Sequence, residues 1–160
     1  MCGILRDGGR PPVRSREVNR AQLQRLAQLR IDDAQALLAT GRWAAAYYLT
    51  GYAVECGLKS CVLGYLDATG MIFDDADYLK SLSGCWTHDF GKLVKLSGLD
   101  AEFGSARSAN PDLEKHWTFA KGWSEASRYL EATTEETARR LFEATTHDPN
   151  GVLTWIRTRW

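Results

Sequence analysis

The sequence predicts an all-α protein, an up-and-down bundle of four to five helices. Apolar residues recur at steps of three and four over most of the chain, which is the period of a helix with one buried face. Start and stop signals typical of helices separate these segments, and no stretch of useful length alternates as a β-strand would. The 160 residues suit one core, so we expect a flexible tail over residues 1–15 and one helical domain over residues 16–160.

Composition and charge limit the classes of function. Hydrophobic residues make up 44% of the chain and charged residues 25%, and the formal net charge is zero, so the chain lacks the strongly basic balance of many nucleic-acid binders. A local basic groove remains compatible with these numbers. The four cysteines form no C-x-x-C pair, and Cys85 and His88 have the spacing of only half a zinc site, so we expect no metal and no cofactor. Unpaired cysteines and an N-terminal segment without an apolar leader favour a cytoplasmic protein.

The first long helix is expected over residues 16–40. Its apolar stripe recurs at helical spacing and consists of Leu23, Ala27, Ile31, Ala34 and Leu38. Gly41 follows in the place of a C-cap glycine, so we expect it to end this helix and to form a one-residue hinge to the next.

The second helix, over residues 43–66, is apolar nearly all round, which is typical of either a membrane span or the central helix of a bundle. Glu55 and Lys59 lie in the middle of this helix, where they would be costly against lipid. No second apolar segment of similar length is present to pair with it, and the flanking helices are amphipathic. The sequence therefore predicts a buried central helix and no membrane association.

Shorter helices are expected after an acidic connection over residues 67–84. Thr87 has the position of an N-cap, with Asp89 in the first turn facing the helix dipole. Gly98 ends this helix, and residues 99–107 are expected to add one or two turns.

The C-terminal part begins with a strong helix start at Asn110-Pro111, an N-cap followed by proline at the first helical position. Residues 127–130 carry no clear signal. Thr133 and Glu136 have the spacing of a capping box that opens another helix. After a turn at residues 148–151, residues 152–160 are expected to form a last short helix.

Four polar residues of the central helix share one face, because Tyr48, Tyr52, Glu55 and Lys59 are spaced i, i+4, i+7 and i+11. A buried carboxylate needs a partner, and Lys59 one turn on is the local candidate. Two interpretations stay open. The stripe is either the less buried edge of the helix with an ordinary surface pair, or Glu55 anchors a polar network across helices or a dimer interface.

Two further pairs could carry chemistry. His88 and Asp89 lie at a helix start, where an anion is favoured, although Asp89 is itself an anion and favours a capping role. Arg140 and His147 are spaced seven apart, which places them on one side of a continuous helix, and such a pair could hold a phosphate and transfer a proton. An Asp-Pro pair directly after His147 leaves open whether this histidine belongs to the helix.

Three motifs resemble one branch of the HEPN family, the higher eukaryotes and prokaryotes nucleotide-binding domain. Residues 41–59, GRWAAAYYLTGYAVECGLK, are similar to the pattern G-R-x-x-x-A-x-Y-x-x-x-x-A-x-E-x-x-L-K in the second helix of that branch. Residues 87–93, THDFGKL, resemble its T-H-D-hydrophobic-x-x-L motif, and residues 127–129, SRY, resemble its short R-Y element. The order and the spacing agree, and the resemblance covers about residues 20–158.

The resemblance implies an all-α bundle of four to five helices that is commonly a homodimer. It also implies a prokaryotic cytoplasmic setting, often in a toxin–antitoxin or defence locus, with a nucleotidyltransferase-like protein as partner. Many members are metal-independent ribonucleases whose active site forms at the dimer interface from an arginine and a histidine that follows four to six residues later.

The chain departs from the nuclease pattern of that family. Arg140 is followed by Leu141 where the catalytic branches have a polar residue, and His147 is followed by Asp-Pro where a tyrosine is common. The Arg128-Tyr129 element has no histidine at the expected distance. The resemblance therefore supports the fold more than ribonuclease activity.

The leading hypothesis is a non-catalytic binding module for nucleotide, RNA or a nucleotidyltransferase-like partner. Charge-assisted phosphate contacts and tyrosine stacking would hold the ligand. The expected lining of its polar groove is Arg42, Tyr52, Glu55, Lys59, His88, Asp89, Arg128 and Tyr129. One alternative is a metal-independent RNase toxin that uses Arg140 and His147 at a dimer interface. Another is a structural dimerisation protein in which Trp155, Ile156 and Trp160 cap an apolar surface.

Overall fold

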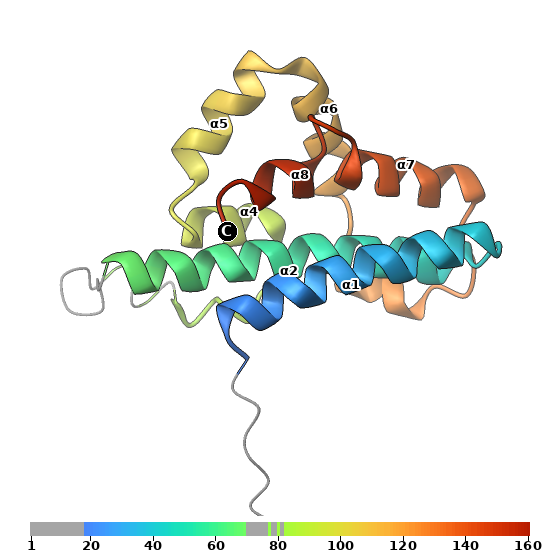
Figure 1. Ribbon diagram of the computed structural model, residues 1–160, viewed down its shortest axis with the longest axis horizontal. Helices are drawn as coiled ribbons and strands as arrows, with labels where there is room; N and C mark the ends of the chain where they lie inside the picture. The colour runs from blue at the N-terminus through green and yellow to red at the C-terminus, as the bar shows by residue number, and fades with distance from the viewer. Residues whose placement is uncertain (1–17, 70–76, 78–79, 81) are drawn as a thin grey trace, which may run out of the picture.

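The computed structural model describes residues 18–69, 77, 80 and 82–160. Within these ranges the chain is all-helical, with seven α-helices, one 3-10 helix and no strand (Figure 1). This confirms the predicted fold class. The helices outnumber the four to five expected because breaks at Gly98 and at Asn110 divide the middle of the chain into short separate helices. The predicted tail, residues 1–15, lies outside the described residues.

The two longest helices, α1 (Arg20–Ala39) and α2 (Trp43–Thr69), run antiparallel and side by side, as predicted (Figure 1). α1 begins later than expected, at a capping box between Asn19 and Gln22 in which each side chain accepts from the backbone of the other residue. Gly41 has a φ of +73°, a left-handed conformation that favours glycine, and it forms the predicted hinge.

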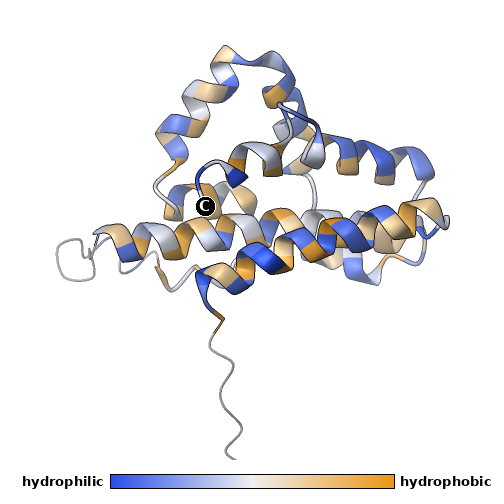
Figure 2. Ribbon diagram, viewed as in Figure 1, coloured by the Kyte–Doolittle hydropathy of each residue, from blue (hydrophilic) through white to orange (hydrophobic). Residues whose placement is uncertain are grey.

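α2 is the central helix of the bundle. It is buried over most of its middle and packs against α1 on one side and against later helices on the others (Figures 1 and 2). Small residues allow this close approach: a Cβ added at Gly51 would overlap the ring of Trp123, and one at Gly57 would meet Leu153 at 2.8 Å. The predicted buried central helix is therefore confirmed. None of the described helices is long and apolar enough to span a membrane.

Three short helices follow, α4 (Phe90–Leu96), α5 (Asp100–Ala109) and α6 (Pro111–Ala120). The N-cap of α4 is Asp89 and not Thr87 as predicted, because the Asp89 carboxylate accepts from the Lys92 backbone at 2.9 Å. Thr87 instead accepts from the Asp89 backbone at 3.1 Å. α6 starts as predicted, with the Asn110 side chain as its cap and proline at its first position.

The last elements are the 3-10 helix η1 (Glu125–Tyr129), α7 (Glu135–Thr146) and α8 (Val152–Arg157). The cap of α7 is Thr134, whose side chain accepts from the Thr137 backbone at 3.1 Å. The predicted capping box at Thr133 and Glu136 is therefore wrong by one residue.

The C-terminal aromatic residues complete the main core. Ile156 is buried, and Trp155 and Trp160 are partly buried against the same core cluster. The alternative in which these residues cap a separate apolar surface is not what the packing shows. Their packing against the core stabilises the monomer, which is sufficient to explain these large apolar side chains.

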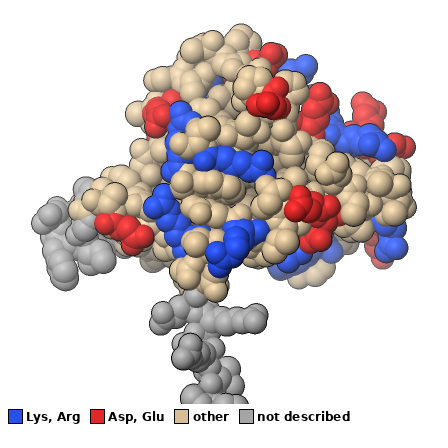
Figure 3. Space-filling model, in the orientation of Figure 1, with Lys and Arg blue, Asp and Glu red and all other residues tan. Residues whose placement is uncertain are grey.

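Positive side chains gather on the face seen in Figure 3, where α8 and the chain's C-terminus lie near the start of α1. Arg157 donates to Gln28 at 2.5 Å, and Arg159 pairs with Glu102 at 2.6 Å. These two arginines are thus already engaged within the chain.

Candidate functional site

The predicted binding residues are distributed over two hollows along α2. Arg42 and Arg128 line the first hollow. Tyr52, Glu55 and Lys59 line the second. His88 reaches Glu55 from the segment before α4. Asp89 and Tyr129 are among the lining residues of neither hollow.

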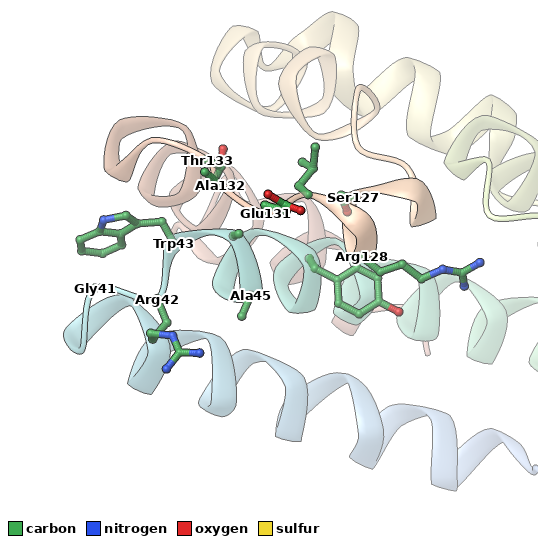
Figure 4. Close-up of a pocket in the computed structure, with 12 residues that line it drawn as sticks. Gly41, Arg42, Trp43, Ala45, Ser127, Arg128, Glu131, Ala132 and Thr133 are labelled. Carbon is green, nitrogen blue, oxygen red and sulfur yellow. The ribbon is translucent and has the colours of Figure 1, made fainter.

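We call the first hollow the hinge pocket. It has a volume of about 510 Å³ and lies between the start of α2 and the segment around the end of η1 (Figure 4). It is lined by Gly41, Arg42, Trp43, Ala44, Ala45, Tyr48, Ser127, Arg128, Leu130, Glu131, Ala132 and Thr133. Its size is within the range of small-molecule sites.

The turn between α1 and α2 determines where the first turn of α2 points. The Arg42 backbone donates to the Leu37 carbonyl at 2.9 Å, and the Gly41 backbone donates to the Leu38 carbonyl at 3.4 Å. This is a Schellman motif, in which the residue in the left-handed conformation ends one helix and reverses the chain. The short turn aims the first turn of α2 into the hinge pocket.

The electrostatics of the hinge pocket favour an anion. The first hydrogen bond of α2 runs from the Ala46 N–H to the Arg42 carbonyl. The backbone N–H groups of Trp43, Ala44 and Ala45 therefore have no carbonyl acceptor within the helix and can donate to a ligand. The helix dipole adds a positive partial charge at the same place. Arg42 and Arg128 are exposed, and neither forms an ion pair within the described part of the chain. The two arginines therefore bring positive charge to the pocket that no ion pair within the described residues neutralises.

One acidic residue opposes this charge. Figure 4 shows the arginine side chains at two ends of the hinge pocket, Arg42 near α1 and Arg128 near the middle of α2, with Glu131 between them. With two cations and one anion in the lining, the formal charge is 2 − 1 = +1, and the helix terminus adds to it. Glu131 is thus expected to weaken anion binding without abolishing it.

Aromatic rings provide the apolar part of the hinge pocket. Tyr48 is half-buried and stacks with Trp123 at 6.1 Å and with Tyr52 at 6.0 Å between ring centroids. The Arg139 guanidinium lies 5.3 Å from the centre of the Trp43 ring, and Glu135 holds it there at 2.7 Å. Positive groups next to aromatic rings are the usual recognition elements for nucleotides.

A buried carboxylate is the centre of the second hollow. Glu55 has only 2% of its surface exposed, and its two oxygens accept from Lys59 Nζ and from His88 Nδ1, each at 2.8 Å. Since a carboxylate only accepts, His88 carries a hydrogen on Nδ1. Of the two interpretations left open by the sequence, the structure shows the network across helices.

We call the second hollow the apolar groove. It has a volume of about 540 Å³ and lies between the start of α1, the middle of α2 and the segment that leads into α4. It is lined by Val18, Leu23, Leu26, Tyr52, Glu55, Cys56, Lys59, Val62, Leu63, Cys85, Trp86 and Leu93. Trp86 is 83% exposed at its rim, which is unusual for a large apolar side chain.

Tyr52 and Cys56, which also line the apolar groove, are neutral at neutral pH. Burial first, and then the neighbouring Cys56 and Glu55, raise the pKa of Tyr52 to about 12. Burial and Glu55 raise the pKa of Cys56 to about 12 as well. The Cys56 thiol is therefore not a nucleophile at neutral pH.

A histidine that the sequence analysis did not single out lies in a third polar cluster, between α6 and the end of α7. The rings of His116 on α6 and His147 at the end of α7 are 5.3 Å apart. Arg140 lies 4.3 Å from the centre of the Phe119 ring and lines, with His116, a hollow of about 240 Å³. His116 was missed as a site residue because only the packing of α6 against α7 brings it to His147.

The third cluster has the groups needed for proton transfer. His116 donates from Nδ1 to the Asn150 carbonyl at 2.9 Å, which leaves its other ring nitrogen as an acceptor when the ring is neutral. His147 is the C-cap of α7 and is exposed. The Arg140 and His147 side chains both face α6, although no hydrogen bond joins them.

Neither a metal site among the described residues nor a match to a known protein indicates the function of the chain. Among the described residues no three or more His, Cys, Asp or Glu side chains are grouped so that they could hold a metal ion. Comparisons of the chain with protein-family models, with curated proteins and with solved structures find no match.

Proposed function

We propose that this chain is a HEPN-type helical binding module that holds a phosphate-bearing ligand, a nucleotide or an RNA, in the hinge pocket. The observation that carries the proposal is that Arg42 and Arg128, far apart in the sequence, line the same pocket at the start of α2, one at each end of it (Figure 4). These are also the arginines of the G-R and R-Y motifs that resemble the family. A phosphate at the helix start would accept from the free N–H groups of α2 and from Arg42, and Arg128 would hold a second phosphate or another polar group of the ligand.

The aromatic lining of the pocket suits the rest of a nucleotide. Tyr48 and Trp43 give flat apolar surfaces beside the cationic groups, so a base could stack while its phosphate remains near the helix terminus. By the same resemblance we propose a homodimer, a nucleotidyltransferase-like protein partner and a prokaryotic toxin–antitoxin or defence setting. No reaction is needed for this function.

Replacing Arg42 or Arg128 with alanine is expected to weaken binding of a fluorescent ATP analogue about 10- to 100-fold each, because each removes a charge-assisted hydrogen bond of about 1.5–3 kcal/mol. Glu131→Gln is expected to strengthen it about two- to fivefold, because it removes the one anion of the pocket. Fluorescence anisotropy at constant salt measures all three affinities.

The matched control for charge is Lys95→Ala, which removes an exposed cation of α4 that lies outside the hinge pocket. Its affinity is expected to equal that of the wild type. Undetectable binding by the wild type, or equal weakening in Lys95→Ala and Arg42→Ala, would contradict a specific site.

Metal-independent RNA cleavage is a second candidate function, and the contact between His116 and His147 favours it. Two histidines can act as general base and general acid on a phosphodiester, with Arg140 to hold the phosphate. The departures at Leu141 and after His147 are the reason that this function comes second.

An assay on labelled single-stranded RNA with EDTA present separates the two candidates. The binding module predicts no cleavage. If the chain is a ribonuclease, we expect the wild type to cleave, and we expect the rate of cleavage to fall at least about 100-fold in His116→Ala, His147→Ala and Arg140→Ala. The control is Arg139→Ala, which replaces the exposed residue next to Arg140 on α7 and is expected to cleave like the wild type. Cleavage of equal rate in every variant would indicate a contaminating nuclease.

A further inference from the structure

The hinge pocket and the apolar groove are connected along one face of α2. Tyr48 lines the first hollow and Tyr52 lines the second, and their rings are nearly parallel, with centroids 6.0 Å apart and an interplanar angle of 5°. From Arg42 to Lys59 the helix rises about 25 Å at 1.5 Å per residue. That length corresponds to about seven stacked nucleotides at 3.4 Å each.

An exposed aromatic side chain lies beside each of the two hollows. Trp86 at the rim of the apolar groove is 83% exposed, and Tyr129 next to the hinge pocket is 74% exposed. The Arg128 guanidinium lies 4.8 Å from the centre of the Tyr129 ring. Large rings that a monomer leaves in water are the elements of a stacking platform for bases, and at Tyr129 a cation lies beside the ring.

None of the residues that line the apolar groove is an unpaired anion that would repel a phosphate backbone. Both oxygens of Glu55 are occupied by Lys59 and His88, while Tyr52 and Cys56 are neutral. The Lys59 ammonium uses one of its three donors on Glu55 and keeps two. The polar group that this groove presents to a ligand is therefore a cationic donor.

We infer that the hinge pocket and the apolar groove together form a track for single-stranded nucleic acid, with phosphates at Arg42, Arg128 and Lys59 and bases stacked on Tyr129 and Trp86. This inference rests on the proposed function of the hinge pocket and extends it from one phosphate to a chain of several nucleotides. A single strand is required because bases paired in a duplex cannot stack on side chains.

Anisotropy with labelled oligoadenylates of two, four and eight nucleotides, as RNA and as DNA, tests the track. We expect affinity to rise at least about tenfold from the dinucleotide to the octanucleotide, since stacking contributes about 1–3 kcal/mol per base. For the octanucleotide, the logarithm of affinity should fall with the logarithm of salt with a slope of about −2, because three contacts each contribute about −0.7.

Trp86→Ala is the decisive variant, because its side chain is exposed and its loss leaves the core unchanged. It is expected to weaken octanucleotide binding about fivefold or more and to leave dinucleotide binding unchanged. The control is Leu29→Ala, an exposed apolar residue of α1 that lines neither hollow.

The outcomes separate this inference from the proposed function. Binding that depends on Arg42 but is equal for two and eight nucleotides, with no effect of Trp86→Ala, would overturn the track and keep the hinge pocket. Binding of neither length would overturn both.

Discussion

Replacing Lys59 with methionine is expected to lower the free energy of unfolding by about 2–4 kcal/mol. The methionine keeps the apolar stem of the side chain and removes only the charge. Glu55 then stays buried, with 3% of its side chain exposed, and His88 becomes its one remaining partner. An uncompensated buried carboxylate is costly, and urea denaturation at neutral pH measures this cost.

Two comparisons test this explanation. Lys80→Met removes the cation of an exposed pair with Asp77 and is expected to cost less than about 0.5 kcal/mol. The double variant Glu55→Leu/Lys59→Met removes both charges and is expected to recover most of the lost stability. If Lys59→Met were as mild as Lys80→Met, the Glu55 network would be an ordinary surface pair.

Replacing Gly51 with alanine is expected to destabilise the chain by about 3 kcal/mol. The added Cβ would overlap the indole ring of Trp123, which is buried and stacks on Phe90 with centroids 5.3 Å apart. Overpacking of this kind costs about 1–3 kcal/mol or more, which exceeds the gain of up to about 1 kcal/mol in helix propensity. Thermal unfolding measures the effect.

Gly104→Ala is the matched control on α5. A Cβ there meets nothing within 4 Å, so only the helix propensity changes, and a gain of about 0.5–1 kcal/mol is expected. Opposite signs for the same substitution at two helical glycines would show that contact with Trp123 decides the result at Gly51. Stabilisation at both positions would contradict the packing of Trp123 against α2.

The long elements of the fold follow from local patterns. The stripe from Leu23 to Leu38 and the glycine at 41 were sufficient to predict α1, the hinge and the direction of α2, because all three depend on residues close in sequence. Caps were less accurate. The N-cap of α7 is Thr134 and not Thr133. Either of two adjacent threonines has a side-chain oxygen that can cap a helix, and the backbone conformation decides which of them does so.

The candidate sites depend on contacts between distant segments, which one sequence does not contain. The pairing of Glu55 with Lys59 was predictable from a spacing of four, whereas the hydrogen bond from His88 depends on the docking of the α4 segment on α2. For the same reason the sequence suggested Arg140 and His147 but not His116. The division of the predicted groove into two hollows also became visible only with the fold.

The central claim, that a phosphate-bearing ligand binds at the N-terminus of α2, is tested most directly by NMR. A titration of the 15N-labelled chain with ATP and with a short oligoadenylate reports on every backbone amide. We predict that the largest shifts occur at Trp43, Ala44 and Ala45 and that Arg42→Ala removes them. Shifts confined to the α6–α7 cluster around His116, or no shifts with either ligand, would contradict the claim.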